Sequence, residues 1–96
     1  MVYEWDPAKA AANLRKHDVS FSETASVFLD SFALTFPDPD PSDEDDREIT
    51  IGVSSRQRTL FVSHLERDDR IRIISARRAT RKERLQYEKR ISEESR

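Results

Sequence analysis

A chain of 96 residues has room for one sheet and two or three helices, and its lack of cysteine excludes disulfides and thiolate metal sites. Apolar residues make up 35%, and no apolar run approaches the roughly 20 residues that span a bilayer, so we expect one soluble, cytoplasmic domain over residues 1–96. The net charge of −2 hides an asymmetry, because residues 1–66 carry 6 basic and 13 acidic side chains whereas residues 67–96 carry 11 and 6.

The chain begins with a predicted short strand over residues 2–5. Asp6 then has the features of a helix N-cap, and Pro7 suits the first helical position because its missing N–H costs no hydrogen bond there. The following residues favour a first helix, rich in alanine, that ends near His17 and Asp18.

A second short helix is predicted next, because Ser20 and Glu23 have the spacing of a capping box. The two helices would form a helical hairpin. After them a strand is expected over residues 31–36, where apolar and small or polar residues alternate. The apolar side of the second helix is expected to consist of Phe21, Ala25, Phe28 and Leu29.

Residues 37–46 form an acidic segment with three prolines and six acidic side chains. Prolines at this density prevent a helix or a central strand, so we expect an exposed loop. The loop can be a solvated connector that protects an edge strand, a docking site for a basic partner, or a divalent cation site. Its spacing does not match that of a calcium-binding loop.

The next apolar runs predict a meander of antiparallel strands over residues 47–54, 59–66 and 70–75. Thr80 and Glu83 have capping-box spacing and begin a last helix that is expected to run to about residue 93. This order predicts an α+β fold with an antiparallel sheet of about four strands, two N-terminal helices and one C-terminal helix. We expect the helices to cover one face of the sheet and a ligand to bind on the other.

The basic C-terminal part carries the strongest chemical signal. Arg77, Arg81 and Arg84 fall at i, i+4 and i+7, which predicts three guanidinium groups on one side of a helix, a pattern suited to phosphate. Glu83 and Tyr87 are four residues apart on an adjacent face and are suited to transferring or orienting a proton. With one glycine in the chain, a P-loop and a dinucleotide-binding motif are excluded.

Structural explanations remain open for the same residues. Lys16 and His17 end a helix, where the helix dipole alone favours positive charge. His64 can be a half-buried polar residue of a strand, Glu83 can be only a helix cap, and Tyr87 can simply pack. The basic helix can be a solvated face or a docking surface for an acidic protein segment.

Several motifs are similar to those of one protein family. Glu4-Trp5-Asp6-Pro7 is followed by Lys16-His17 one helix later and then by the block Arg72-Ile73-Ile74-Ser75-Ala76-Arg77. With these motifs the chain resembles, over nearly its whole length, the BrnT family of ribonuclease toxins of bacterial type II toxin–antitoxin systems. Family members often have a histidine where this chain has Pro41. Further matching positions are Tyr3, Lys9, Asn13, Val19, Ser20, Phe21, Glu23, Val27, Phe28, Asp30, Asp38, Pro39, Asp40, Arg47, Gly52, Glu83 and Tyr87.

The resemblance implies a RelE-like fold and cleavage of RNA without a metal ion or another cofactor. It also implies a toxin that inhibits translation and growth until a cognate BrnA-type antitoxin neutralises it. The expected complex is a hetero-oligomer of two toxins and two antitoxins that contacts operator DNA only through the antitoxin. No role at a membrane is expected.

The site is expected to stabilise the charge that develops when a ribose 2′-hydroxyl attacks the neighbouring phosphate. Arg72 and Arg77 with Lys16 are assigned to this charge, and three other side chains compete for proton transfer. The alternative to an enzyme is a non-catalytic basic module that binds nucleic acid or an acidic partner. The expected catalytic residues are Lys16, His17, His64, Arg72, Arg77 and Glu83, of which His17, His64 and Glu83 compete for proton transfer, and the expected RNA contacts are Arg47, Arg70, Arg78, Arg81, Arg84 and Tyr87.

Overall fold

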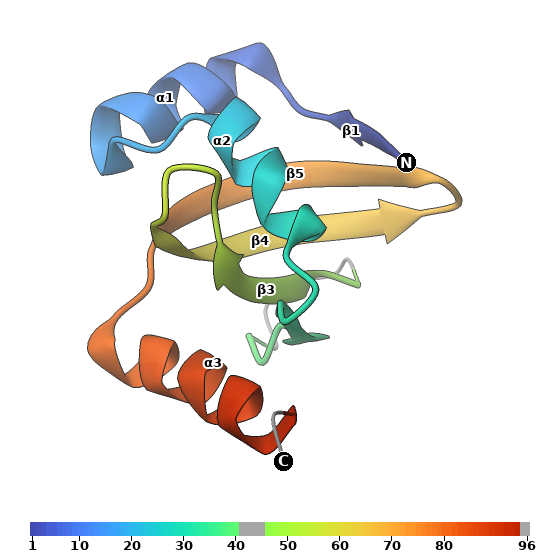
Figure 1. Ribbon diagram of the computed structural model, residues 1–96. Coiled ribbons are helices and arrows are strands. Elements are labelled where there is room, and N and C mark those ends of the chain that lie inside the picture. The colour runs from blue at the N-terminus through green and yellow to red at the C-terminus, as the bar shows by residue number, and fades with distance from the viewer. Residues whose placement is uncertain (41–45, 95–96) are drawn as a thin grey trace.

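The computed structural model describes residues 1–40 and 46–94 of the chain (Figure 1). The centre of the acidic segment, including Pro41, lies outside the described residues, and so does part of the suggested cation or docking site. No helix in the described part is long and apolar enough to cross a membrane. In chain order the elements are β1 (Val2–Glu4), α1 (Pro7–His17), α2 (Phe21–Ala25), the 3₁₀ helix η1 (Ser26–Leu29), β2 (Leu34–Pro37), β3 (Glu48–Val53), β4 (Thr59–Arg67), β5 (Arg70–Arg78) and α3 (Arg81–Glu94).

The strands form one sheet in the order β1-β5-β4-β3-β2. Neighbouring strands are antiparallel except β1, which runs parallel to β5 and pairs Val2 with Arg70 and Glu4 with Arg72. The α+β class is confirmed, but the predicted antiparallel sheet of about four strands was wrong, because the sheet is mixed and has five. The parallel pair joins segments that lie far apart in the chain, and a local sequence pattern does not encode such a contact.

The helices cover both faces of the sheet. α1, α2 and η1 pack on one face, where Val19 and Val27 contact Leu60 and other buried residues of β4 and β5, whereas α3 packs on the opposite face (Figure 1). On that opposite side Tyr87 contacts Ile49 and Ile51 of β3. The expectation that all helices share one face was therefore wrong. α3 packs against β3 and does not cover the part of the same sheet face that is formed by β5 and the adjacent residues of β4, such as Leu65 (Figure 1). We call this uncovered area the open face.

Local capping signals define the helix ends. The Asp6 carboxylate accepts a hydrogen bond from the Ala8 N–H at 3.0 Å, and Asp18 ends α1 in the left-handed region with a φ of 57°. At α3 the capping box is complete, because the Glu83 N–H donates to Thr80 Oγ1 at 3.2 Å and the Thr80 N–H donates to Glu83 Oε1 at 2.8 Å. The predicted boundaries of the first and last helices are thereby confirmed.

Three local expectations differ from the structure. β5 extends beyond its predicted end, because pairing with β4 continues there, so Arg77 belongs to a strand and shares no helix face with Arg81 and Arg84. α2 passes into η1, a turn of different pitch, which leaves Leu29 81% exposed rather than on the apolar side. The strand that follows covers Leu34–Pro37, slightly later than predicted.

β5 contains a bulge. Ser63 of β4 pairs with Ser75 of β5, but the next β4 residue, His64, pairs with Ile73, so Ile74 is left without a partner in β4. An extra residue of this kind interrupts the alternation of side chains along a strand. Positions on opposite sides of the bulge therefore share a face when their residue numbers differ by an odd number.

The bulge distributes apolar and basic side chains between the two faces. Ile73 and Ala76 are both 1% exposed and both pack beneath α1 and α2, although a regular strand would place them on opposite faces. Arg72 pairs with Leu65, and Arg77 pairs with Phe61, four positions before Leu65 in β4. Both arginines therefore lie on the open face. The sequence spacing alone would have separated them.

Asn13 joins α1 to β5. Its side chain is buried, and Nδ2 donates to the carbonyl oxygens of Val19 at 3.0 Å and Ala76 at 2.8 Å. Oδ1 accepts from the Ala76 N–H at 3.1 Å. β1 pairs only with residues 70–72, so the backbone N–H and C=O of Ala76 have no neighbouring strand at that edge of β5. The Asn13 amide provides their hydrogen-bond partners instead.

Replacing Asn13 by alanine is expected to lower the free energy of unfolding by about 3 kcal/mol, because buried backbone groups of Val19 and Ala76 lose their partners. Asn13→Asp can still accept from Ala76 N–H but cannot donate, so it is expected to destabilise the fold as well. Urea unfolding measures both, with Gln86→Ala on the exposed side of α3 as the amide control. A change for Asn13→Ala no larger than the control would contradict this role.

Candidate functional site

Cationic side chains gather where α1 and β5 end and α3 begins. Arg58 Nη2 donates to the Asp18 carbonyl oxygen at 2.9 Å, which brings the end of α1 to the start of β4. A groove of about 330 Å³ at the same place is lined by Arg58, Arg78, Arg84 and their neighbours. We call this region the basic end; it comprises Lys16, His17, Arg78, Arg81 and Arg84.

The packing of α1 on β5 directs His17 toward the basic end. The Asn13 amide contacts Ala76, and His17 lies one helical turn beyond Asn13 on the same side of α1. Arg78 lies two residues beyond Ala76 and so on the same face of β5. His17 is half-buried and Lys16 is exposed. The structure therefore brings these two predicted residues toward Arg78.

A buried ion pair fixes this end of α1. Glu23 accepts hydrogen bonds from Arg58 Nε at 2.9 Å, from Arg58 Nη2, and from Ser54 Oγ at 2.6 Å, with its side chain 4% exposed. The bond from Arg58 outweighs burial and holds the pKa of Glu23 below its usual value, so the carboxyl is charged. Ser20 does accept from the Glu23 N–H, but the Glu23 carboxylate binds Ser54 and Arg58 in the β3–β4 turn instead of completing the predicted capping box.

Sequence reasoning missed Arg58 as a structural partner. Its guanidinium holds two elements of the chain together, since it bonds to Glu23 of α2 and to the carbonyl of Asp18 at the end of α1. Glu23 and Arg58 are 35 residues apart, and the local spacing of Glu23 explained it as a cap. The positive charge of Arg58 is therefore largely neutralised within the fold.

Arg77 and Glu83 form a second ion pair, which connects β5 to α3. Arg77 Nη1 and Nη2 donate to Glu83 Oε1 and Oε2 at 2.8 and 2.9 Å, and the guanidinium carbon lies 4.0 Å from the centre of the Phe61 ring. The bonds from Arg77 outweigh burial and lower the pKa of Glu83. Both carboxylate oxygens are occupied, which suits Glu83 to orienting Arg77.

Three cations of the basic end have no carboxylate partner among the described residues: Lys16, Arg78 and Arg81 are all exposed. Arg84 Nε lies 3.8 Å from Glu88 Oε1, but both side chains are about half exposed, and such surface pairs are weak. The basic end therefore presents a net positive charge to solvent. Such a surface can hold an anion.

His64 lies in the core. It is 2% exposed, its Nε2 lies 2.7 Å from Thr50 Oγ1, and its ring packs edge-on against Phe28 at 4.9 Å. Thr50 Oγ1 continues the contact to Thr35 Oγ1 at 2.7 Å. Burial lowers the pKa of His64 to about 4, so the ring is neutral at neutral pH. A substrate at the surface does not reach it.

Tyr87 is also buried, at 5% exposure. Its hydroxyl donates to Asp30 Oδ2 at 2.5 Å, and burial raises the pKa of the phenol. Burial also raises the pKa of Asp30, but hydrogen bonds from Tyr87, Val53 N–H and Phe32 N–H outweigh it and leave that pKa below its usual value. Tyr87 thus ties α3 to the turn after η1.

The structure places the remaining predicted residues away from the basic end. Arg70 and Arg72 lie at the opposite end of β5, near the β4–β5 turn. Arg47 precedes β3 and lines a groove with Asp38 and Asp40. Among residues 1–40 and 46–94, no three histidine or carboxylate side chains are grouped so as to hold a metal ion.

The chain is similar to known toxins in sequence and in fold. A family model of the ribonuclease toxin BrnT, of type II toxin–antitoxin systems, matches residues 5–83. The crystal structure of the Brucella abortus ribonuclease toxin BrnT matches with a TM-score of 0.63 and 22% sequence identity, over 84% of this chain and 100% of that chain. At this identity the structural match shows a shared fold. No curated protein gives a significant match.

The burial of His64 predicts a loss of stability in mild acid. Its folded pKa of about 4 lies below the unfolded value of 6.5, so its contribution is complete above pH 6.5 and declines as pH falls toward 4. Between pH 7 and pH 5 the free energy of unfolding is expected to fall by about 2 kcal/mol, from 1.36 kcal/mol per pKa unit. Carboxyl groups with lowered pKa lose their contribution only at lower pH.

Urea unfolding at both pH values measures this effect. The His64→Asn variant is expected to be less stable but nearly independent of pH in this range, whereas Gln86→Ala on the exposed side of α3 keeps the dependence of the original chain. An equal loss in His64→Asn would show that another group is responsible.

Proposed function

Because the chain belongs to the BrnT family of ribonuclease toxins of type II toxin–antitoxin systems, we propose that it is an endoribonuclease that cleaves RNA at the basic end without a metal ion. The observation that carries this proposal is the exposed, unneutralised charge of Lys16, Arg78 and Arg81, which lie where α1 and β5 end and α3 begins. Arg77 lies at the same end of β5 as Arg78 but on its opposite, open face, where Glu83 orients it. Cleavage of RNA places extra negative charge on the phosphoryl oxygens, and exposed cations can stabilise that charge.

The 2′-hydroxyl of RNA is an internal nucleophile, so no metal-bound water has to attack the phosphorus. Its attack requires a base for the hydroxyl proton, cations for the extra negative charge on the phosphoryl oxygens, and an acid for the leaving 5′-oxygen. Lys16, Arg77 and Arg78 supply the cations. His17 is the proton-transfer group, because an imidazole ring can both accept and donate a proton.

Two residues that the sequence suggested for proton transfer have other roles in this proposal. Glu83 is a positioning residue for Arg77, since both of its oxygens already accept hydrogen bonds. His64 supports the core beneath Phe28. Arg81 and Arg84 bind the RNA backbone next to the reacting phosphate, which agrees with their exposure at the start of α3.

In the cell we expect this activity to inhibit translation and growth by cutting RNA in the cytoplasm. Type II toxins have protein antitoxins, and a BrnA-type antitoxin is the expected partner. The expected complex has two toxins and two antitoxins, and it contacts operator DNA through the antitoxin alone. An antitoxin that covers the basic end would block both binding and cleavage.

The test is incubation of the purified chain with RNA in excess EDTA. Cleavage to products with 5′-hydroxyl ends is expected, and His17→Ala and Arg77→Ala are each expected to lower the rate about a hundredfold, the usual effect of losing one well-placed catalytic donor. Glu83→Gln, which weakens the orientation of Arg77, is expected to have a smaller effect. Lys89→Ala, an exposed site on α3, is the charge-matched control.

Other outcomes would change the proposal. Cleavage that stops in EDTA would contradict independence from metal. Intact RNA that is bound in a salt-sensitive manner would support the non-catalytic basic module instead. Full activity of both the His17→Ala and Arg77→Ala variants would move the active site away from the basic end.

A further inference from the structure

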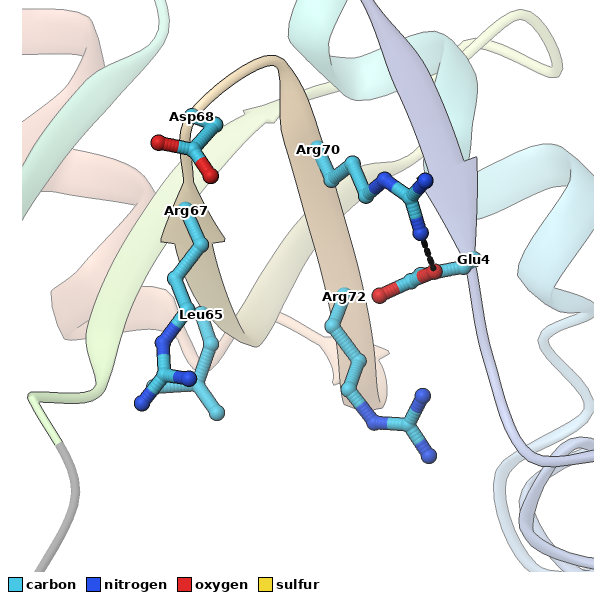
Figure 2. A pocket seen from close by; sticks show the side chains of 6 residues that line it. All are labelled: Glu4, Leu65, Arg67, Asp68, Arg70 and Arg72. Atoms are coloured by element: carbon cyan, nitrogen blue, oxygen red, sulfur yellow. Dashed lines mark hydrogen bonds and ion pairs between the residues drawn. The ribbon is translucent and has the colours of Figure 1, made fainter.

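A second cationic groove lies on the open face, at the other end of β5 from the basic end. It has a volume of about 480 Å³ and is formed by the β4–β5 hairpin together with β1. Figure 2 shows the Arg67 and Arg72 side chains directed to the same side of the hairpin, with Leu65 beside Arg67. We call it the hairpin groove, and its lining residues are Glu4, Leu65, Arg67, Asp68, Arg70 and Arg72.

The arginines of the hairpin groove are available to a ligand. Arg67 and Arg72 have no carboxylate within salt-bridge distance among the described residues. Arg70 Nη1 lies 3.4 Å from Glu4 Oε2, but these side chains are 66% and 38% exposed, so the pair is weak and an anion can replace it (Figure 2). The groove therefore contains more cationic charge than its own carboxylates neutralise.

The bulge connects the hairpin groove to the active site proposed above. Because Ile74 has no partner in β4, Arg70, Arg72 and Arg77 all lie on the open face, with Ser75 between the last two. Neighbouring positions on one face of a strand are about 7 Å apart. Guanidinium groups thus follow one line along β5, from the hairpin to the pair of Arg77 with Glu83.

We propose that the hairpin groove binds the phosphates of a single-stranded RNA that runs along the open face of β5 to the basic end. The inference rests on the proposed ribonuclease function and names how its substrate is held. Arginine forks bind phosphate oxygens bidentately, and Leu65 offers an apolar contact for a ribose or a base.

The carboxylates of the groove favour RNA over an acidic peptide. Glu4 and Asp68 would repel the carboxylates of such a peptide. A nucleotide, in contrast, carries hydrogen-bond donors, namely the ribose 2′-hydroxyl and the base amino groups, that carboxylates can accept. The same groove can thus bind the phosphate and the sugar or base next to it.

The test separates binding from cleavage by using a short RNA that is fully 2′-O-methylated, which retains its phosphates but lacks the nucleophile. Affinity is measured by fluorescence anisotropy over a range of salt concentrations. Arg67→Ala and Arg72→Ala are each expected to weaken binding about threefold to tenfold and to reduce the salt slope by about 0.7, the value for one phosphate contact on a single strand. Lys89→Ala removes an equal charge on α3 and is expected to have little effect.

A second variant tests the role of Glu4. Glu4→Gln releases Arg70 and removes a negative charge, so it is expected to strengthen binding of the methylated RNA about twofold to fivefold, which is of the order measured for one exposed ion pair. Circular dichroism at the temperature of the assay confirms that each variant is folded.

Each result bears on a different claim. Unchanged affinity and salt slope in both arginine variants would overturn the hairpin groove as an RNA site, even if the chain cleaves RNA. Groove-dependent binding by a chain that never cleaves would keep the groove and reject the ribonuclease proposal. Arginine variants that bind RNA normally but lose the antitoxin would assign the groove to that partner and overturn the inference.

Discussion

The structure depends on the bulge of β5, where Ile74 has no pairing partner in β4. It allows Ile73 and Ala76 to pack together beneath α1 and α2, and it turns Arg72 and Arg77 to the opposite, open face. In a regular strand each of these pairs would be divided between the two faces, which would bury a guanidinium or expose a core side chain. The same local irregularity thus completes the core and aligns the cations.

Ion pairs within the fold determine which arginines remain available to bind a ligand. Arg58 is used to clamp Glu23 and the end of α1, and Arg77 is held by Glu83 over the ring of Phe61. Both carboxyl groups have lowered pKa values, so these clamps persist at neutral pH. Among the described residues, Lys16, Arg78 and Arg81 at the basic end and Arg67 and Arg72 in the hairpin groove have no such partner, so free positive charge lies near both ends of β5.

Local features were the predictable part of the structure. Asp6, Pro7 and the box of Thr80 with Glu83 define their helices through contacts within a few residues, and sequence patterns encode such contacts. The parallel pairing of β1, the position of α3 on the second face and the partner of Glu23 depend on contacts between distant segments. The periodicity of the sequence does not reveal the bulge that places Arg72 on the same face as Arg77. The residues around His64 alternate without a clear polar side, so the sequence did not predict that His64 is buried.

The central claim is that RNA follows the open face of β5 between the hairpin groove and the basic end. NMR spectra of the isotope-labelled chain, recorded with and without the 2′-O-methylated RNA, test it most directly. The account predicts that the largest shifts occur in the side-chain Nε–H signals of Arg70, Arg72 and Arg77 and in the backbone around His17. Shifts confined to the outer side of α3 or to the edge strand β2 would contradict it.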